Sequence, residues 1–356
     1  MIPFKQYLKN VLNEDYTVSW MKDGNPASKQ ELKVSDVQFS RAYRYLNVNS
    51  KSESEAYHVI TKEIGLHEKF AKEIVSIVLQ YDNSDAFFKA VNNRTEITEL
   101  LQSGNLINAV VEKYGVDREL AIALLNYTPA TQPVTGKGEM FLTLFAKDAK
   151  KGGVGGGDVV VGDTHYEIKG QGARLRGQKG FGTTNAALIA FKNGLTALAH
   201  KANVPLPSVL EFSIGVKKAG SINAMAPALI ASGKVARDDI INLYIDGFSK
   251  LYDNAEHGFM YEWLNRSIDE QGKTTAEFNL NYFIFAIQYY TMQEHFDYIV
   301  AFVPTGAKAG NVSYISAEQI SNNDNITSHI LPEKMPGITP GAGPQGGFFS
   351  IKPVNA

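Results

Sequence analysis

Residues 157–169 read GDVVVGDTHYEIK, and the expected architecture of the chain follows from them. Residues 158–161 read as a strand, and residues 165–170 read as a second strand that returns beside it. Gly162-Asp163 stands between them and is typical of the two-residue turn of a β-hairpin. The sequence therefore predicts a short antiparallel hairpin in this stretch.

This hairpin is expected to bring two acids and one amine together. Side chains alternate across a strand, so Glu167 and Lys169 project from one face while Ile168 points into the core on the other. Asp158 comes from the neighbouring strand, and the tight turn lets its side chain converge with Glu167. Two carboxylates together with substrate phosphate oxygens suit a hard divalent ion such as Mg²⁺. Lys169 beside that ion could orient or help deprotonate an attacking water, or stabilise charge growing on phosphorus.

Gly157-Asp158-Val159, with Asp158 nine positions before the glutamate of Glu167-Ile168-Lys169, resembles the motif of the PD-(D/E)XK nuclease superfamily of restriction-type and repair endonucleases. The core of that superfamily is a helix, a strand, a hairpin strand, a helix and a strand, and the order of elements expected here is similar. The resemblance covers about 135–200 and a further part at 278–303. It implies an α/β fold of the restriction-endonuclease-like kind, with a mixed central sheet flanked by helices.

The same resemblance implies a role for each residue of the motif. It assigns Asp158 and Glu167 as metal ligands, the main-chain carbonyl of Ile168 as a further ligand, and Lys169 as the catalytic lysine. Glu139, at the start of the helix before the hairpin, matches a glutamate that the superfamily's leading helix often presents to the metal. The implied cofactor is Mg²⁺, with Mn²⁺ as a substitute.

The sequence departs from the superfamily pattern at two places. Gly157 stands where the motif name has proline, which is a common variation. The segment 203–278 is longer than the minimal core needs, so it is expected to be an insertion or a specificity region.

Positive charge is concentrated around the motif. Residues 135–201 carry ten lysines and arginines against five acids, a net charge of +5, while the rest of the chain carries −7. The net charge of −2 makes no case for nucleic acid as a partner of the whole chain. A basic island in an acidic chain, however, is the electrostatic pattern expected for a polyanionic partner.

The basic loop that follows the hairpin, residues 170–180, reads GQGARLRGQKG. Arg174, Arg176 and Lys179 lie among glycines and suit phosphate contacts beside a cleavage site. Gln171 shares the face of Lys169 if the strand persists, and could position a water or contact a base. DNA is therefore the expected partner.

The remainder of the chain indicates two domains. Residues 1–130 are predicted to form an all-α N-terminal domain for partner or DNA contact, and a Pro/Thr-rich linker at 128–133 separates them from a nuclease domain over 131–356. A Gly/Pro-rich end, 335–347, is expected to be an extended surface arm. Further helices are predicted at 140–150, 186–202, 238–252, 260–268 and 278–294, and further strands at 207–217, 298–303 and 312–315.

Composition excludes several classes of protein. The chain has no cysteine, which excludes a disulfide scaffold, a thiol nucleophile and a thiolate zinc site. No apolar run reaches the roughly 18–20 residues that cross a bilayer, and the first residues lack the pattern of a secretion signal. No serine lies in a Gly-x-Ser-x-Gly elbow, so a serine hydrolase has no support. We expect a protein of the cytoplasm, or of the host cytoplasm or virion if it comes from a phage, without a membrane partner.

The sequence thus predicts a Mg²⁺-dependent endonuclease that hydrolyses phosphodiester bonds of DNA, and restriction, repair and phage roles are all compatible with it. The alternative is a non-enzymatic structural or interaction protein, such as a component of a phage particle, that keeps a nuclease-like fold. A homodimer or larger assembly would form through the helical domain. A glycosidase that uses the two carboxylates is disfavoured, because Lys169 and the arginines have no place in that chemistry.

Overall fold

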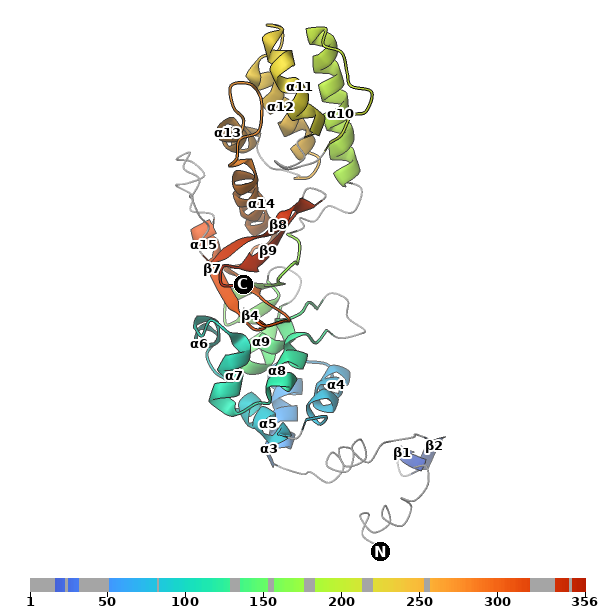
Figure 1. The fold of residues 1–356 in the computed structure, drawn as a ribbon. Helices are drawn as coiled ribbons and strands as arrows, with labels where there is room; N and C mark the ends of the chain where they lie inside the picture. Colours follow the sequence, from blue (N-terminus) through green and yellow to red (C-terminus); the bar gives the residue numbers. More distant parts are fainter. Residues whose placement is uncertain are drawn as a thin grey trace, which may run out of the picture.

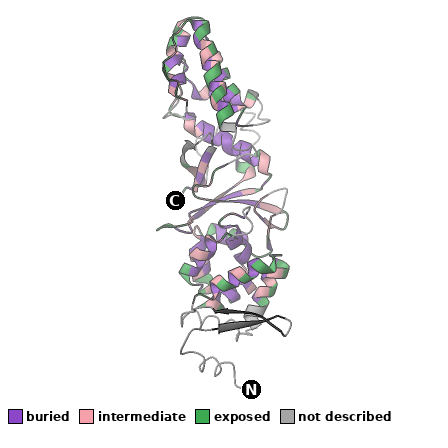
Figure 2. Cartoon of the chain, turned by 90° about the vertical axis from the view of Figure 1, so that its right-hand side faces the viewer, coloured by how far each residue is buried: buried purple, intermediate pink, exposed green. Residues whose placement is uncertain are grey.

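The computed structural model describes residues 17–22, 25–31, 51–81, 83–128, 135–152, 157–175, 183–212, 220–252, 257–320, 337–345 and 348–356. From residue 51 onward the molecule is elongated, with helices at both ends and a sheet between them (Figure 1). The sheet and the helices against it are largely buried, whereas the outer surfaces of the end helices are exposed (Figure 2).

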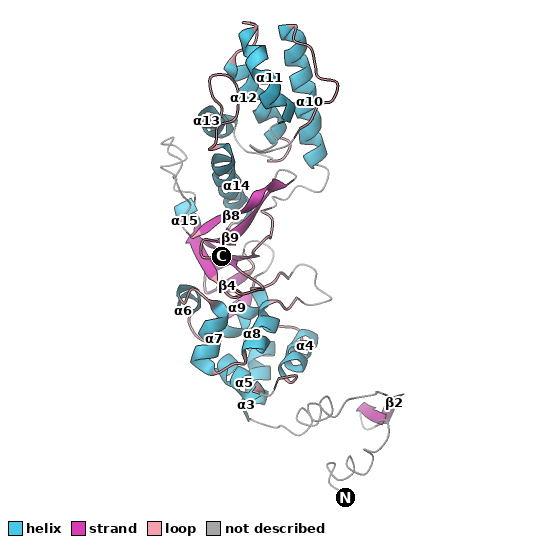
Figure 3. Cartoon of the chain, viewed as in Figure 1, coloured by secondary structure: helices cyan, strands magenta, loops and turns pink. Residues whose placement is uncertain are grey.

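A five-stranded mixed sheet forms the centre of the molecule (Figure 3). Strands β5 and β6 run parallel, with Ile168 opposite Val300, and every other neighbouring pair is antiparallel. The expected α/β class, with a mixed sheet flanked by helices, is confirmed. In spatial order the strands are β3 (Ala149–Lys151), β4 (Val159–Val161), β5 (Thr164–Gly170), β6 (Tyr298–Phe302) and β7 (Val312–Ser316).

One face of the sheet packs on the helices of the first half of the chain. Ile168 and Val300 point to this face and share a hydrophobic core with α9 (Glu139–Phe145). The same core includes residues of α3 (Lys51–His58), the π-helix η1 (Val59–Glu63), α4 (Glu68–Val78), α5 (Ser84–Asn92), α6 (Ile97–Gln102), α7 (Leu106–Tyr114) and α8 (Arg118–Leu125). Ile168 is therefore a core residue, as predicted, and this core continues across the linker expected at 128–133.

The opposite face of the sheet is covered by α14 (Phe278–Glu294), the helix predicted with these bounds. Ile299 and Ala301 alternate with Val300 along β6 and belong to a second hydrophobic core with this helix. Because α9 and α14 lie on opposite faces, the end of β5 is approached by side chains from both.

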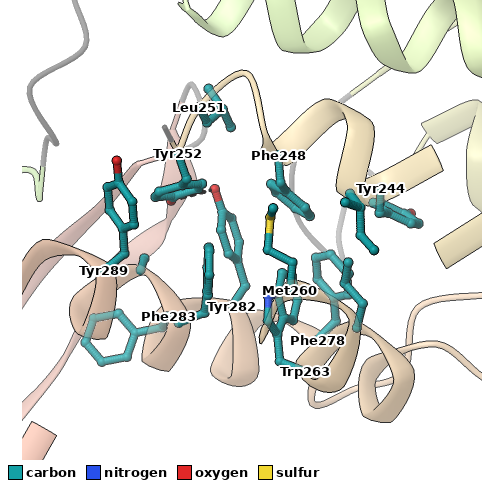
Figure 4. Packing of buried hydrophobic residues seen from close by; sticks show 14 of the residues in the cluster. Tyr244, Phe248, Leu251, Tyr252, Met260, Trp263, Phe278, Tyr282, Phe283 and Tyr289 are labelled. Atoms are coloured by element: carbon teal, nitrogen blue, oxygen red, sulfur yellow. Dashed lines mark hydrogen bonds between the residues drawn. The ribbon is translucent and has the colours of Figure 1, made fainter. Parts of the chain in front are cut away.

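A helical bundle continues from α14 away from the sheet. It consists of α10 (Thr183–Ala202), α11 (Gly220–Ala231), α12 (Arg237–Phe248) and α13 (His257–Ser267), and the last three of these helices lie within the predicted insertion. Aromatic rings join it to α14: Trp263 stacks on Tyr282 with 5.5 Å between ring centroids, and Phe248 lies 4.8 Å from Tyr282 (Figure 4). At Gly247 a Cβ would come within 2.1 Å of the Phe191 ring, so the close approach of α10 and α12 requires glycine.

The C-terminal segment corrects the expectation of a surface arm. Strands β8 (Ile338–Gln345) and β9 (Phe348–Pro353) form an antiparallel hairpin that packs against α14. Its inward side chains Ile338, Phe349 and Ile351 are buried. Glycine and proline favour an extended chain, but the alternation of Phe349 and Ile351 gives that chain an apolar face, which the core covers.

The predicted N-terminal region contains helices from residue 51 onward, as expected, but it is not all-α. Strands β1 (Thr17–Lys22) and β2 (Asn25–Glu31) pair as an antiparallel hairpin ahead of the helices, with an irregular register between Trp20 and Met21. Thr17, Val18 and Trp20 are residue types enriched in strands, a signal that the helical pattern farther along the chain obscures.

Two predicted elements end elsewhere. The helix expected at 140–150 stops at Phe145. The backbone amide of Thr95 donates to the Phe145 carbonyl, and the Thr95 carbonyl accepts from the Lys147 amide, so these groups are not available to continue the helix. The strand expected at 207–217 is absent over 207–212, which have no regular structure, and 213–217 lie outside the described residues.

Candidate active site

The candidate site lies where β4 begins beside β5. Val159 forms the last pair of this ladder, opposite Tyr166. Just before it, Asp158 donates its amide to the Tyr166 carbonyl at 2.7 Å, and its carboxylate oxygen Oδ2 accepts from the amide of Ile168 at 2.8 Å. The Asp158 side chain thus takes the position that a backbone acceptor would occupy in a longer strand. The hairpin predicted from sequence places Asp158 beside Glu167-Ile168-Lys169.

The Lys169 ammonium lies between the two acids of the motif. Its Nζ contacts Glu167 Oε1 directly and lies 3.7 Å from Asp158 Oδ2. The side chain of Glu167 is 6% exposed and that of Lys169 17% exposed, so this pair is not a solvated surface ion pair. The structure therefore brings the two predicted carboxylates and the predicted lysine together.

Glu167 also contacts Tyr290 of α14, a residue that was not predicted from the sequence to belong to the site. The Tyr290 hydroxyl donates to Glu167 Oε1, and Lys169 Nζ lies 5.7 Å from the centroid of the Tyr290 ring. Because apolar side chains occur on every side of α14, its sequence pattern does not mark the face that meets the site. The polar residue that stands out in it, Gln288, is buried elsewhere and donates to the Ile320 carbonyl at 3.1 Å.

Glu139 approaches the site from the other face of the sheet. It is the first residue of α9, is buried, and accepts a hydrogen bond from the Gly136 amide. Gly138, between them, has φ +83°, and a Cβ there would come within 2.5 Å of the Phe302 ring. The glycine therefore lets the start of α9 press against β6 and directs Glu139 to the end of the sheet.

A pocket of about 440 Å³ opens at this place. Five of the predicted site residues contribute to its wall, namely Glu139, Asp158, Ile168, Lys169 and Gln171. Glu167 does not line it, because its side chain turns toward Tyr290 and Lys169. The remaining lining residues are Gly136, Lys137, Gly170, Ala173 and Pro304, none of which was predicted as a site residue.

The pocket brings the carboxyl groups of Glu139 and Asp158 close to each other and to Lys169. Burial, followed by repulsion from Asp158, raises the pKa of Glu139 to about 8. Burial also raises the pKa of Asp158, since the attraction of Lys169 is too weak to offset it and Glu167 adds repulsion. Burial opposes the charged form of Lys169, but the oxygens of Tyr290, Glu167 and Asp158 outweigh it and raise the pKa of the ammonium. Lys169 is thus a hydrogen-bond donor at neutral pH. A further cation near Glu139 and Asp158 would stabilise their charged forms.

Backbone hydrogen bonds to two different strands fix the first part of the basic loop. Gln171 donates its amide to the Phe302 carbonyl of β6 at 2.7 Å, and Leu175 donates to the Phe349 carbonyl of β9 at 2.9 Å. Arg174 pairs with Ser350 in an isolated bridge and does not line the pocket. Gln171 therefore lies at the site and Arg174 beside it, while Arg176 and Lys179 fall outside the described residues.

The donor atoms around the pocket fit a hard divalent cation. Within the described ranges, no three histidine or acidic side chains converge closely enough to hold a metal ion by themselves. Mg²⁺ is typically bound by one or two carboxylates together with substrate phosphate and waters. Asp158 lines the pocket and would supply one carboxylate. Glu167 does not line it, but it shares the Lys169 ammonium with Asp158 and would supply the second. The amide and carbonyl of one strand residue point to the same edge, so the Ile168 carbonyl lies on the side of Asp158.

Comparison with protein-family models, with curated proteins and with solved structures finds no match to this chain. None of the helices in the described part of the chain is both long enough and apolar enough to cross a membrane. The roles of the pocket residues therefore rest on their geometry and chemistry.

Proposed function

We propose that this protein is a Mg²⁺-dependent endonuclease that hydrolyses phosphodiester bonds of DNA. The observation that carries the proposal is the pocket at the end of β5, where Glu139, Asp158 and Lys169 converge next to the Ile168 main chain. The chain order α9, β3, β4, β5, α10, then α11 to α14, and β6 supports a restriction-endonuclease-like fold. Apart from β3 and the additional helices α11 to α14, it follows the helix, strand, hairpin strand, helix and strand of the PD-(D/E)XK superfamily.

Asp158, Glu167 and the carbonyl of Ile168 would hold the cation. When bound, Mg²⁺ neutralises the phosphodiester and acidifies a water. The mutual repulsion of the acids supports such a site, since a divalent ion would relieve the repulsion that Asp158 and Glu139 experience.

Lys169 acts as a donor in this proposal. Its raised pKa keeps it protonated at neutral pH, so it is unsuited to take up a proton. The ammonium can instead donate a hydrogen bond to a lone pair of the attacking water, or stabilise negative charge on the phosphate. The acids that keep it charged also fix its position, because Nζ is shared between Glu167 and Asp158.

Gln171 and the start of the basic loop favour nucleic acid as the substrate. Gln171 lines the pocket, and the pinned segment 171–175 carries the chain from the pocket to Arg174. The Gln171 amide at the pocket and the exposed Arg174 three residues farther along the chain suit contacts with the sugar-phosphate backbone near the scissile bond.

The test is cleavage of plasmid DNA with Mg²⁺ or Mn²⁺, with and without a chelator. Wild-type protein should cut only with the cation present, and Asp158→Asn should not cut. This change keeps an acceptor for the Ile168 amide while it removes the charge. Asp163→Asn, in the exposed hairpin turn, is the matched control and should cut normally.

Parallel reactions with RNA of the same sequence establish which nucleic acid is preferred. Full cleavage by Asp158→Asn would refute the assignment of this pocket. DNA binding by the wild type without any cleavage would instead favour the alternative, an interaction protein that keeps a nuclease-like fold.

A further inference from the structure

Lys137 lines the same pocket as Asp158 and Lys169 but differs from both in its surroundings. Its side chain is exposed, and it forms no ion pair with any residue that the structure describes. In the sequence it is one of ten basic residues in the island around the motif, and no spacing rule distinguishes it from the others.

The backbone on both sides of Lys137 is fixed. The Gly136 amide donates to the Glu139 side chain, and the Gly138 amide donates to the Leu125 carbonyl at 2.9 Å. The Gly138 carbonyl in turn accepts from Leu142 at 3.0 Å, within the first turn of α9. The Cα of Lys137 therefore has a defined place at the pocket.

The neighbouring lysines are already engaged. Lys169 is held by Glu167 and Asp158, and Lys151 donates to the Thr135 hydroxyl. Lys137, by contrast, can reach a ligand at the pocket without giving up an ion pair in the described structure. An ammonium is a compact charge with three donors, and such a group binds phosphate oxygens well.

We propose that Lys137 binds a phosphate group of the polynucleotide next to the bond that is cut. The inference rests on the proposed function and extends it, because it names a substrate-binding residue on the α9 side of the pocket. Lys137 would act on binding of the substrate, whereas Lys169 and the acids act on the reaction.

The experiment measures the affinity of the protein for a short fluorescent DNA duplex by anisotropy, with Ca²⁺ as the cation, over a range of salt concentrations. The logarithm of the association constant falls linearly with the logarithm of the salt concentration, and each phosphate contact contributes about 0.9 to the magnitude of that slope. Lys137→Ala should lower that slope by about 0.9, which corresponds to a loss of roughly eightfold in affinity at about 0.1 M salt. Lys137→Arg should retain both values.

Lys234→Ala is the matched control, because Lys234 is an exposed lysine in the distant helical bundle and the change removes the same charge. Its slope should equal that of the wild type. Under cleavage conditions with Mg²⁺, Lys137→Ala should raise KM severalfold and leave kcat within about twofold of the wild type. The reason is that the lost contact would bind the substrate and the transition state equally strongly.

A wild-type slope for Lys137→Ala, or a loss in kcat at unchanged KM, would overturn the inference while the nuclease assignment stood. If the wild type neither binds nor cuts DNA or RNA, the proposed function fails and the inference fails with it. Circular dichroism and thermal unfolding of each variant show whether a changed affinity reflects a changed fold.

Discussion

Tyr290 donates a hydrogen bond to Glu167 although the two residues lie 123 positions apart in the chain. The contact crosses from α14 to β5, so the helix both covers the sheet and holds an acid of the candidate site. Burial raises the pKa of Tyr290, and its hydroxyl therefore keeps its proton throughout the neutral range. The Tyr290 ring also packs on Phe296, with 5.9 Å between ring centroids, so removal of the hydroxyl alone leaves the packing in place.

Tyr290→Phe should weaken cation binding without unfolding the protein. A hydrogen bond to a charged group contributes about 1.5–3 kcal/mol, which corresponds to a factor of roughly ten to a hundred if its role is to orient Glu167 for the cation. Titration calorimetry with Mn²⁺ measures this loss directly, and cleavage rates should fall in parallel. Tyr261→Phe is the control, because that hydroxyl donates to Asp238 on the exposed surface of the bundle at 3.1 Å. Equal Mn²⁺ affinities for the two variants would show that Tyr290 does not position Glu167.

Lys169→Ala should cost stability as well as activity. The change leaves Glu167 buried without its cation, and breaking a buried pair in this way costs about 3–5 kcal/mol. Lys113→Ala is the comparison: Lys113 also pairs with a glutamate, Glu99, but the two side chains are 40% and 58% exposed. A pair this exposed contributes less than about 1 kcal/mol.

Urea unfolding of both lysine variants measures the difference. The double variant Lys169→Met with Glu167→Gln should regain much of the stability and none of the cleavage, since it removes both buried charges. Equal losses for Lys169→Ala and Lys113→Ala would contradict the buried character of the Glu167–Lys169 pair.

The parts of the site that could be predicted from sequence are those fixed by neighbours in the chain. Gly162-Asp163 set the turn, and the turn set Asp158 beside Glu167-Ile168-Lys169. The alternation of strand residues also placed Ile168 in the core. For the same reason α14 could be predicted with its observed bounds, because an apolar helix of that length has its own local pattern.

The parts that could not be predicted depend on contacts between distant segments. Tyr290 has no feature that separates it from the other aromatic residues of α14, and only the packing of that helix on β5 selects it. Strand β3 has three residues and exists because β4 pairs with it. The C-terminal hairpin was obscured by its glycines and prolines, whose composition indicates an extended chain and says nothing about what that chain packs against.

Ile351→Ala tests the role of the C-terminal hairpin. Ile351 is fully buried between the hairpin and α14, and truncation of such a side chain costs about 2–5 kcal/mol. Val354→Ala, three residues farther on, removes a side chain that is 56% exposed and should change stability by less than about 0.5 kcal/mol. The free energy of unfolding in urea distinguishes the two. If the C-terminal segment were a surface arm, as its glycine and proline content suggests, both substitutions would lower the free energy of unfolding by similar small amounts.

Glu139 should make stability depend on pH in a direction opposite to that of most acids. Its pKa rises from an ordinary value of 4.5 when unfolded to about 8 when folded, because burial and the charge of Asp158 penalise the carboxylate. Between these two values the folded state holds a proton that the unfolded state has lost. The stability contributed by this group is therefore fully present below pH 4.5 and is lost as pH rises toward 8.

Urea unfolding of the wild type and of Glu139→Gln across this interval, without divalent cations, measures the effect. Glutamine is neutral at every pH and keeps an acceptor for the Gly136 amide, so the variant should gain stability relative to the wild type as pH rises. Mg²⁺ should reduce the difference, because a cation in the pocket favours the carboxylate that burial disfavours. A difference between the two proteins that stays constant with pH would show that Glu139 is ionised throughout, and would remove the electrostatic reason to place a cation at its side.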